Sequence, residues 1–433
     1  MSGERPISSR AVRLGVLALC EFAMLLRAPG LVRAPRFYAE EGHFHFAFAF
    51  DHGFWETLAY VHTGAGYTNW IANLATACAS CVPLELAPAV TTGFALVVQT
   101  LPLVIILWGR SLLFRDLPRQ LAGCGVVVFA PSVDGEVWLT TLSSQVFFGL
   151  IALVILLEDF EAMGPIRRLA YPALLLLGGL SGPYALFLLP VFLLRLIVTR
   201  QRALIPACGA LVLALAVQLG VVLSLNSVVD PRRFAAPSLQ LAATISVHHI
   251  GIPLFGEDLT RKLAAGLGEQ VFGVAFLVLA PFAFFDFHTR RLRLASPCAL
   301  LVLAFGIVAA AVSQLALMGA FVGRYAVVPG YALLFCLIDR AALPKRSWSG
   351  TVALGLLVVS LAAGVLGYRE HPAFACDGAH PSSWSEEVER WRKDPLAARF
   401  WKRPVSDSIR ICPVGWTMEL HRAGPGGQTP SSP

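Results

Sequence analysis

Charged side chains are scarce in this chain of 433 residues. Asp, Glu, Lys and Arg together make up 14% of it, against about 25% in soluble domains. Hydrophobic residues make up 56%, and the mean hydropathy is +0.68. This balance excludes an ordinary soluble enzyme and indicates a membrane protein. The net charge of +7 does not predict a nucleic-acid partner, because basic residues gather at the cytoplasmic ends of membrane helices.

Strong signatures of metal and redox sites are also lacking. Four of the ten histidines lie between residues 43 and 62, but their spacing fits no zinc motif. His43 and His45 would point away from each other on a helix. We expect no metal ligands there, and a divalent metal elsewhere stays open. Cys376 and Cys412 lie in a polar tail, where they either pair in an oxidising compartment or remain free thiols.

The apolar residues form blocks of near 20 residues, which is the length of a membrane-spanning helix. Such blocks favour helices over a barrel, so we predict an all-α bundle. Arg5, Arg10 and Arg13 lie before and at the start of the first block, about 12–31, which places the N-terminus in the cytoplasm. Glu21 and Arg27 interrupt this block, so we interpret it as a retained helix and not as a cleaved signal peptide.

Positive charge also sets the path of the rest of the chain. If 68–82 crossed the membrane, the basic loop 110–119 would lie outside, so we predict that 68–82 lies at the outer surface or dips into it. About eleven transmembrane helices then leave every inner loop basic. The further predicted spans are 87–108, 120–131, 146–158, 169–180, 184–199, 204–225, 267–285, 297–318, a segment that begins near 323, and 350–367.

This arrangement predicts two parts. Residues 1–367 form a transmembrane catalytic module, whose first outer loop, 32–86, carries interfacial helices. Residues 368–433 form a short extracytoplasmic tail with a disordered end. In the tail, Trp384, Val388 and Trp391 share one face of an amphipathic helix. The protein is therefore predicted to be a multi-pass protein of the cytoplasmic (inner) membrane.

The first outer loop carries the chain's most distinctive polar stretch. Glu40 and Glu41 stand side by side before a run of alternating phenylalanines, and aromatic residues favour the membrane interface. A carboxylate that is partly desolvated there can act as a general base. The alternative is that the two carboxylates are solvated or pair with Arg33 or Arg36.

Other candidate substrate-binding residues lie on the same predicted side. Asp134 and Glu136 occupy the second outer loop, either as sugar or metal ligands or as a solvated pair. Arg324 suits a lipid phosphate, because guanidinium binds phosphate in a bidentate way. Its alternative is snorkelling to the interface. The wider candidate set also includes Tyr67, His248, His249 and Tyr325.

Several short motifs carry a resemblance to a known superfamily. They are YAEEG at 38–42, GYTNWIANLA at 66–75, LSGPYALFLLP at 180–190, GRY at 323–325 and CPVGWTMEL at 412–420. With an acidic motif after the first helix and a second acidic outer loop, the chain resembles the GT-C superfamily of membrane glycosyltransferases, within a bacterial group of similar length. The resemblance implies a GT-C-like bundle that transfers sugar from a polyprenyl-phosphate carrier, with inversion, on the outer face.

The resemblance also implies roles for individual residues. Glu40 or Glu41 would deprotonate the acceptor, Asp134 would match the second-loop acid, and Arg324 would hold the carrier phosphate. The acceptor would be an envelope glycan or lipid. The alternative function is a transporter or flippase for a lipid-linked sugar, which should have ionisable residues deep in several spans.

Overall fold

The protein is described here by a computed structural model. The structure describes residues 9–62, 67–131, 137–225, 245–267, 323–342, 348–368, 382–393, 408–413 and 415–420. These residues are mostly helical, as the all-α prediction expects. The N-terminal half contains α1 (Ser9–Arg27), α2 (Pro29–Arg33), the π-helix η1 (Glu41–Phe46), α3 (Ala47–His52), α4 (Phe54–Leu58), α5 (Trp70–Ser80), α6 (Ala87–Trp108), α7 (Leu117–Phe129), α8 (Ser144–Leu156), α9 (Pro165–Leu180), the 3-10 helix η3 (Leu186–Leu188), α10 (Leu189–Thr199), η4 (Arg202–Leu204) and α11 (Ile205–Ser224).

The remaining elements come from shorter described segments. They are the π-helix η6 (Ile245–Gly251), α13 (Ile252–Phe255), α14 (Glu257–Leu267), α17 (Gly323–Ala341), α18 (Trp348–Leu366), α19 (Trp384–Lys393), β1 (Ser408–Ile411) and β2 (Trp416–Glu419). The two strands pair antiparallel.

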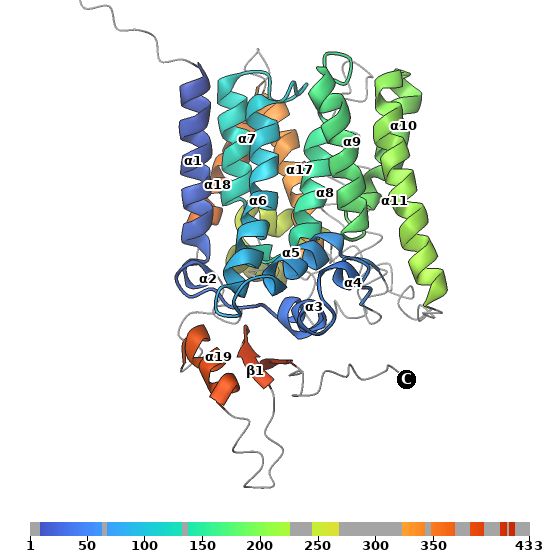
Figure 1. Ribbon diagram of the computed structural model, residues 1–433. Coiled ribbons are helices and arrows are strands. Elements are labelled where there is room, and N and C mark those ends of the chain that lie inside the picture. Colours follow the sequence, from blue (N-terminus) through green and yellow to red (C-terminus); the bar gives the residue numbers. More distant parts are fainter. Residues whose placement is uncertain are drawn as a thin grey trace, which may run out of the picture.

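The long helices stand side by side as a bundle (Figure 1). All residues of α8 are buried, because α6, α9 and α17 pack around it. A helix that is apolar on every side is stable only when it is enclosed in this way or by lipid. The core of the bundle therefore centres on α8.

Two helices in the described ranges, α6 and the segment Arg202–Ser224, are long and apolar enough to cross a membrane. Others, such as α7 and α8, are apolar but have only 13 residues. A helix of that length rises about 20 Å, against a hydrocarbon core of about 30 Å. The predicted spans 267–285 and 297–318 lie outside the described residues.

Hydrogen bonds show which helix ends lie together. Arg119 donates to the carbonyl of Ala342 at 3.2 Å, and the Tyr331 hydroxyl donates to the carbonyl of Val127 at 3.1 Å. These contacts make α7 and α17 antiparallel. Arg27, the last residue of α1, donates to the carbonyl of Val128 at 3.0 Å. The end of α1, the end of α7 and the start of α17 therefore share one end of the bundle, which we call the loop end.

The opposite end, which we call the basic end, is held together around a buried carboxylate. Glu158 accepts hydrogen bonds from the backbone N–H of Arg110 at 2.8 Å and from the hydroxyl of Tyr171 at 3.0 Å. Arg195 donates to the backbone carbonyl of Glu158 at 2.8 Å. The loops between α6 and α7 and between α8 and α9 are joined there.

Helix α5 lies across the loop end (Figure 1). It has 11 residues, or a rise of about 16 Å, and whether 68–82 lies at a membrane surface stays a prediction. The Thr68 hydroxyl donates to the carbonyl of Leu180 at 2.7 Å. Gln218 accepts a hydrogen bond from the Thr68 N–H at 2.9 Å. The start of this segment is thus fastened to α9 and α11.

The tail docks on the first loop, 32–86 (Figure 1). Trp384 is buried and donates from its indole N–H to the carbonyl of Leu84 at 2.9 Å. Arg36 donates to the carbonyls of Arg410 at 2.9 Å and Ser382 at 2.6 Å. The predicted amphipathic helix is confirmed as α19, with Val388 fully buried. The β1–β2 hairpin was not predicted. The tail end, 421–433, lies outside the described residues.

Replacing Trp384 with Ala should release the tail from the bundle. The change deletes a buried indole and its hydrogen bond, which costs about 3–5 kcal/mol for a large aromatic side chain. Limited proteolysis of the purified protein should cut the tail of the variant faster. Trp348→Ala is the control, since Trp348 is 81% exposed. Equal cleavage of Trp384→Ala and wild type would refute this account of docking.

Candidate functional site

The two adjacent glutamates of the first loop have different surroundings. The side chain of Glu41 is 2% exposed. One of its carboxylate oxygens accepts the backbone N–H of Thr141 at 2.9 Å and also the Thr141 hydroxyl. The other accepts the backbone N–H of Tyr38 at 3.4 Å. Glu41 therefore joins the first loop to the segment before α8, 100 residues further along the chain.

Burial governs the ionisation of Glu41. Removal from water raises the pKa of this carboxyl, and the hydrogen bonds from Thr141, Tyr38 and Thr91 oppose that rise. A buried carboxylate without a cationic partner is costly unless donors surround it. The predicted alternative, pairing with Arg36, does not occur, because the Arg36 guanidinium donates to the tail carbonyls of Ser382 and Arg410.

Glu40 is the accessible member of the pair. Its side chain is half-buried, and it makes no hydrogen bond or salt bridge to another residue in the described ranges. It lies close to His62, since its negative charge raises the pKa of that imidazole while burial, the larger effect, lowers it. His43 is part of the same group and acts on His62 in the opposite direction. Solvent can therefore reach Glu40, whereas Glu41 is enclosed.

The backbone around both glutamates is strained. Ala39 has φ of 42°, and Leu139, two residues before Thr141, has φ of 57°. Positive φ in a residue with a side chain costs about 1–3 kcal/mol and persists only where its surroundings enforce it. Such strain clusters at functional sites. Two of the three non-glycine residues with positive φ in the described chain therefore flank the Glu41–Thr141 contact.

A π-helix follows Glu40. Helix η1 begins at Glu41, and π-helical turns occur frequently at functional sites. Within it, His43 and His45 point to different partners, as the sequence predicts. The Nδ1 atom of His43 lies 2.6 Å from the carbonyl of Thr417, and that of His45 lies 2.9 Å from the Asn73 side-chain oxygen. Burial lowers the pKa of His45 to about 4, so it is neutral at pH 7.

Tyr67 lies in the same region. Its hydroxyl accepts a hydrogen bond from the Gln145 amide at 3.2 Å, and its backbone pairs with that of His62. His62 is the imidazole next to Glu40. Glu40, Glu41 and Tyr67 therefore all lie at the loop end, and whether they form one site stays a prediction.

The other predicted site residues are placed only in part. Asp134 and Glu136 lie outside the described residues. Arg324 is the second residue of α17 and is half-buried, at the same end of the bundle as Arg27. Tyr325 follows it in the helix. Whether these residues contact one substrate stays a prediction.

His248 and His249 lie on the second π-helix, η6, which packs against α17. Burial lowers the pKa of His248 to about 4 and that of His249 to about 3. Neither ring nitrogen of His249 has a hydrogen-bond partner in the described part of the chain. At pH 7 both imidazoles are uncharged, so a phosphate would meet a neutral donor here and not a cation.

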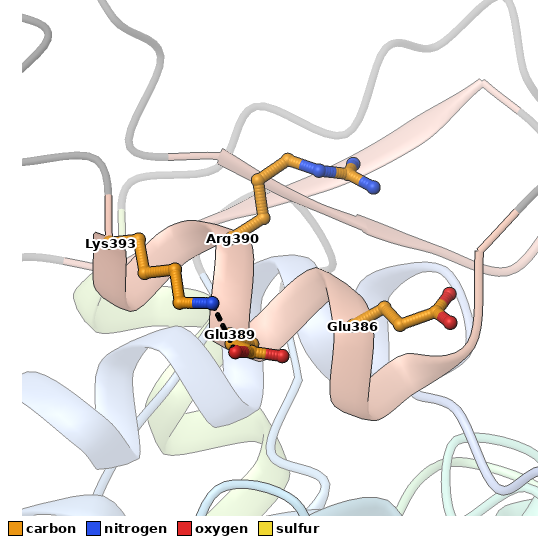
Figure 2. Close-up of a pocket in the computed structure, with 4 residues that line it drawn as sticks. All are labelled: Glu386, Glu389, Arg390 and Lys393. Carbon is orange, nitrogen blue, oxygen red and sulfur yellow. Dashed lines mark hydrogen bonds and ion pairs between the residues drawn. The ribbon is translucent and has the colours of Figure 1, made fainter.

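A surface depression lies on helix α19 of the tail, away from Glu40 and Glu41. It is lined by Glu386, Glu389, Arg390 and Lys393 of α19, and Figure 2 shows their charged side chains. Lys393 pairs with Glu389 one helical turn away. Exposed pairs of this kind contribute little and are typical of a solvated helix face. We assign no site to it.

Among the described residues, His, Cys, Asp and Glu side chains form no group of three or more that could hold a metal ion. Six cysteines in the same ranges are free, including Cys78 and Cys81. Cys412 is disulfide-bonded, and Cys376, its predicted partner, lies outside the described residues.

Sequence reasoning missed Thr141 and the tail as parts of this site. Thr141 lies within the predicted second outer loop, 131–145, and has no distinctive motif of its own. Cys412 stands in the CPVGWTMEL motif and is predicted to be either paired or a free thiol, with no role in the site. No family model, curated protein or solved structure matches this chain. The resemblance to the GT-C superfamily therefore stays a prediction.

The raised pKa of Glu41 predicts a pH-dependent stability. A carboxyl with a higher pKa in the folded state stabilises the fold at pH values below its unfolded pKa, about 4.5. This stabilisation is lost as pH rises through the folded value. The free energy of unfolding of wild type minus that of Glu41→Gln should therefore decrease as pH rises from 4.5 to 8, because only the wild-type carboxyl loses this stabilisation. Thermal unfolding in detergent measures it, and a constant difference would contradict the assignment.

Proposed function

We propose that the protein is an integral-membrane inverting glycosyltransferase. It transfers a sugar from a polyprenyl-phosphate carrier to an envelope glycan or lipid on the outer face of the inner membrane. The observation that carries the proposal is the division between the two glutamates of the first loop. Glu41 is buried and fixed by Thr141, while Glu40 beside it is reachable. A general base must come within hydrogen-bond reach of its substrate.

The proposed reaction needs one base and one group that binds phosphate. Glu40 accepts the proton of the acceptor hydroxyl as that oxygen attacks the anomeric carbon. The bond from this carbon to the phosphate oxygen breaks, and the polyprenyl phosphate leaves with the bonding electrons. Arg324 offsets the negative charge of this leaving group. Its position at the loop end, the end that carries Glu40, supports this role.

The proposed placement in a membrane is supported by the apolar and tryptophan side chains that are exposed on the bundle. The outward faces of α1, α11 and α18 carry exposed apolar residues such as Phe22, Leu223 and Val358, which are suited to lipid contact. Tryptophan favours both interfaces. Trp55, 80% exposed, lies in the first loop, and Trp348 begins α18 near the basic end. We propose about eleven spans, including the shorter helices.

Two features orient the protein in the membrane. Arg110, Arg119 and Arg195 lie at the basic end, which the positive-inside rule places in the cytoplasm with the N-terminus. The disulfide-bonded Cys412 lies on the first loop at the opposite end. Disulfides persist in oxidising compartments, so the glutamates and the C-terminus are proposed to be extracytoplasmic.

A transporter or flippase for a lipid-linked sugar is the second candidate. One observation favours it: His249 is an ionisable residue that is fully buried on a π-helix. Ionisable residues buried in membrane proteins often line transport paths. A flippase would move the lipid without altering it, and it would not need an accessible carboxylate at Glu40.

The test is transfer of labelled sugar from a panel of polyprenyl-phosphate sugars to a crude envelope-lipid acceptor. Glu40→Gln should reduce transfer by about 100-fold or more, the loss expected for a general base, with unchanged folding. Glu41→Gln should retain measurable transfer, because its amide can still accept from Thr141. Arg324→Lys should lower transfer less than Arg324→Ala does, since only bidentate geometry is lost.

The matched control is Glu56→Gln, which changes an exposed carboxylate of the same loop and should leave transfer unaltered. Full activity in Glu40→Gln would refute the base assignment. Movement of the labelled carrier across liposomes without any transfer would favour the flippase.

A further inference from the structure

The backbone of Cys412 is inserted against the residues that precede Glu40. Its N–H donates to the carbonyl of Phe37 at 2.9 Å, and its carbonyl accepts the N–H of Ala39 at 2.5 Å. Tyr38, between them, pairs with Cys412 as a parallel bridge. The Cys412 side chain is completely buried and disulfide-bonded. One residue of the tail thus holds the first-loop backbone on both sides of Tyr38.

This contact falls where the first loop is strained. Ala39 has a positive φ, which an alanine keeps only when outside contacts enforce it. The Ala39 N–H donates a hydrogen bond to the carbonyl of Cys412, and the residue after Ala39 is Glu40. The turn continues with hydrogen bonds from the Glu41 N–H to the Tyr38 carbonyl at 2.9 Å and from the His43 N–H to the Ala39 carbonyl at 3.0 Å. The direction of the Glu40 side chain therefore depends on the position of Cys412.

Some other contacts of the tail also reach this turn, through side chains: the Nδ1 atom of His43 lies 2.6 Å from the carbonyl of Thr417, and Ile411 packs beside Phe37 and Gly42. The ion pair and the indole hydrogen bond of α19 lie further away. Arg392 forms a bidentate ion pair with Glu85, and the Trp384 indole bonds to Leu84. Both hold α19 against the far end of the first loop. They fasten the tail to the bundle, whereas Cys412 forms backbone hydrogen bonds on both sides of Tyr38, next to the glutamates.

We propose that Cys412 is a positioning residue of the catalytic site. Its backbone, fixed in place by its disulfide, holds Ala39 in the left-handed conformation and so aims Glu40 at the acceptor. This inference rests on the proposed function. It makes the C-terminal tail part of the site, and it makes activity depend on an oxidised Cys412.

The experiment compares the oxidised full-length protein with the protein treated with dithiothreitol and with Cys412→Ser. The dithiol gives two electrons and closes to its own disulfide, while the Cys412 disulfide opens to two thiols. Amide hydrogen exchange over residues 37–43 reports the contact. The same samples are assayed for kcat and for KM with the polyprenyl-phosphate sugar.

Reduction and Cys412→Ser should each accelerate exchange over 37–43 by about tenfold or more. Both should lower kcat by about tenfold, with KM for the donor within about twofold, because donor binding is not the step that Glu40 serves. Cys81→Ser is the matched control, since Cys81 is an exposed free cysteine of the same loop. Cys81→Ser should change neither the exchange over 37–43 nor kcat, and dithiothreitol should affect it as it affects wild type.

Two results would overturn the inference: unchanged exchange over 37–43 on reduction, or faster exchange with unaltered kcat. A global rise in exchange in Cys412→Ser would mean that this variant is misfolded, and the reduced wild-type protein then decides. If the oxidised wild type transfers no sugar, the proposed function fails, while faster exchange on reduction would still support the contact itself.

Discussion

The hydrogen bonds between Glu41 and Thr141 are the contact on which the loop end depends. They join residues 100 positions apart, and they bury a carboxyl that water would otherwise solvate. A buried carboxyl without these donors would be strongly destabilising. Because Glu41 is anchored in this way, the turn before it is fixed, and its neighbour Glu40 faces outward from a defined position.

Two adjacent carboxylates with opposite surroundings are a recurrent solution in catalysis, since different environments give the same side chain different roles. Here Glu41 is a buried hydrogen-bond acceptor, and Glu40 is the residue proposed to act as the base. The tail adds a second restraint from outside the bundle, through Arg36 and Cys412. The proposed site is thus built from segments that begin and end the chain.

Much of the helical framework follows from hydropathy. The predicted span 87–108 has the same limits as α6, because a long apolar run between polar ends leaves little freedom. The prediction that 68–82 does not cross the membrane rests on the positive charge of loop 110–119, which follows α6. The choice between Glu40 and Glu41 could not be predicted, because it depends on Thr141, a distant residue without a motif.

The C-terminal hairpin was also beyond sequence reasoning. Strands of four residues are too short to show a clear alternation, and β1 and β2 are stabilised by packing against the first loop, with Ile411 beside Phe37 and Gly42. The amphipathic helix α19 could be predicted, because its helical periodicity extends over ten residues. Contacts between distant segments, and not local propensity, decide which of the polar residues form the site.

The most direct test of the central claim is carbodiimide labelling of the purified protein, followed by mass spectrometry of the first-loop peptide. The account predicts that Glu40 is modified and Glu41 is spared, and that a bound polyprenyl-phosphate sugar protects Glu40. Faster modification of Glu41, or labelling of Glu40 that the donor does not alter, would contradict it.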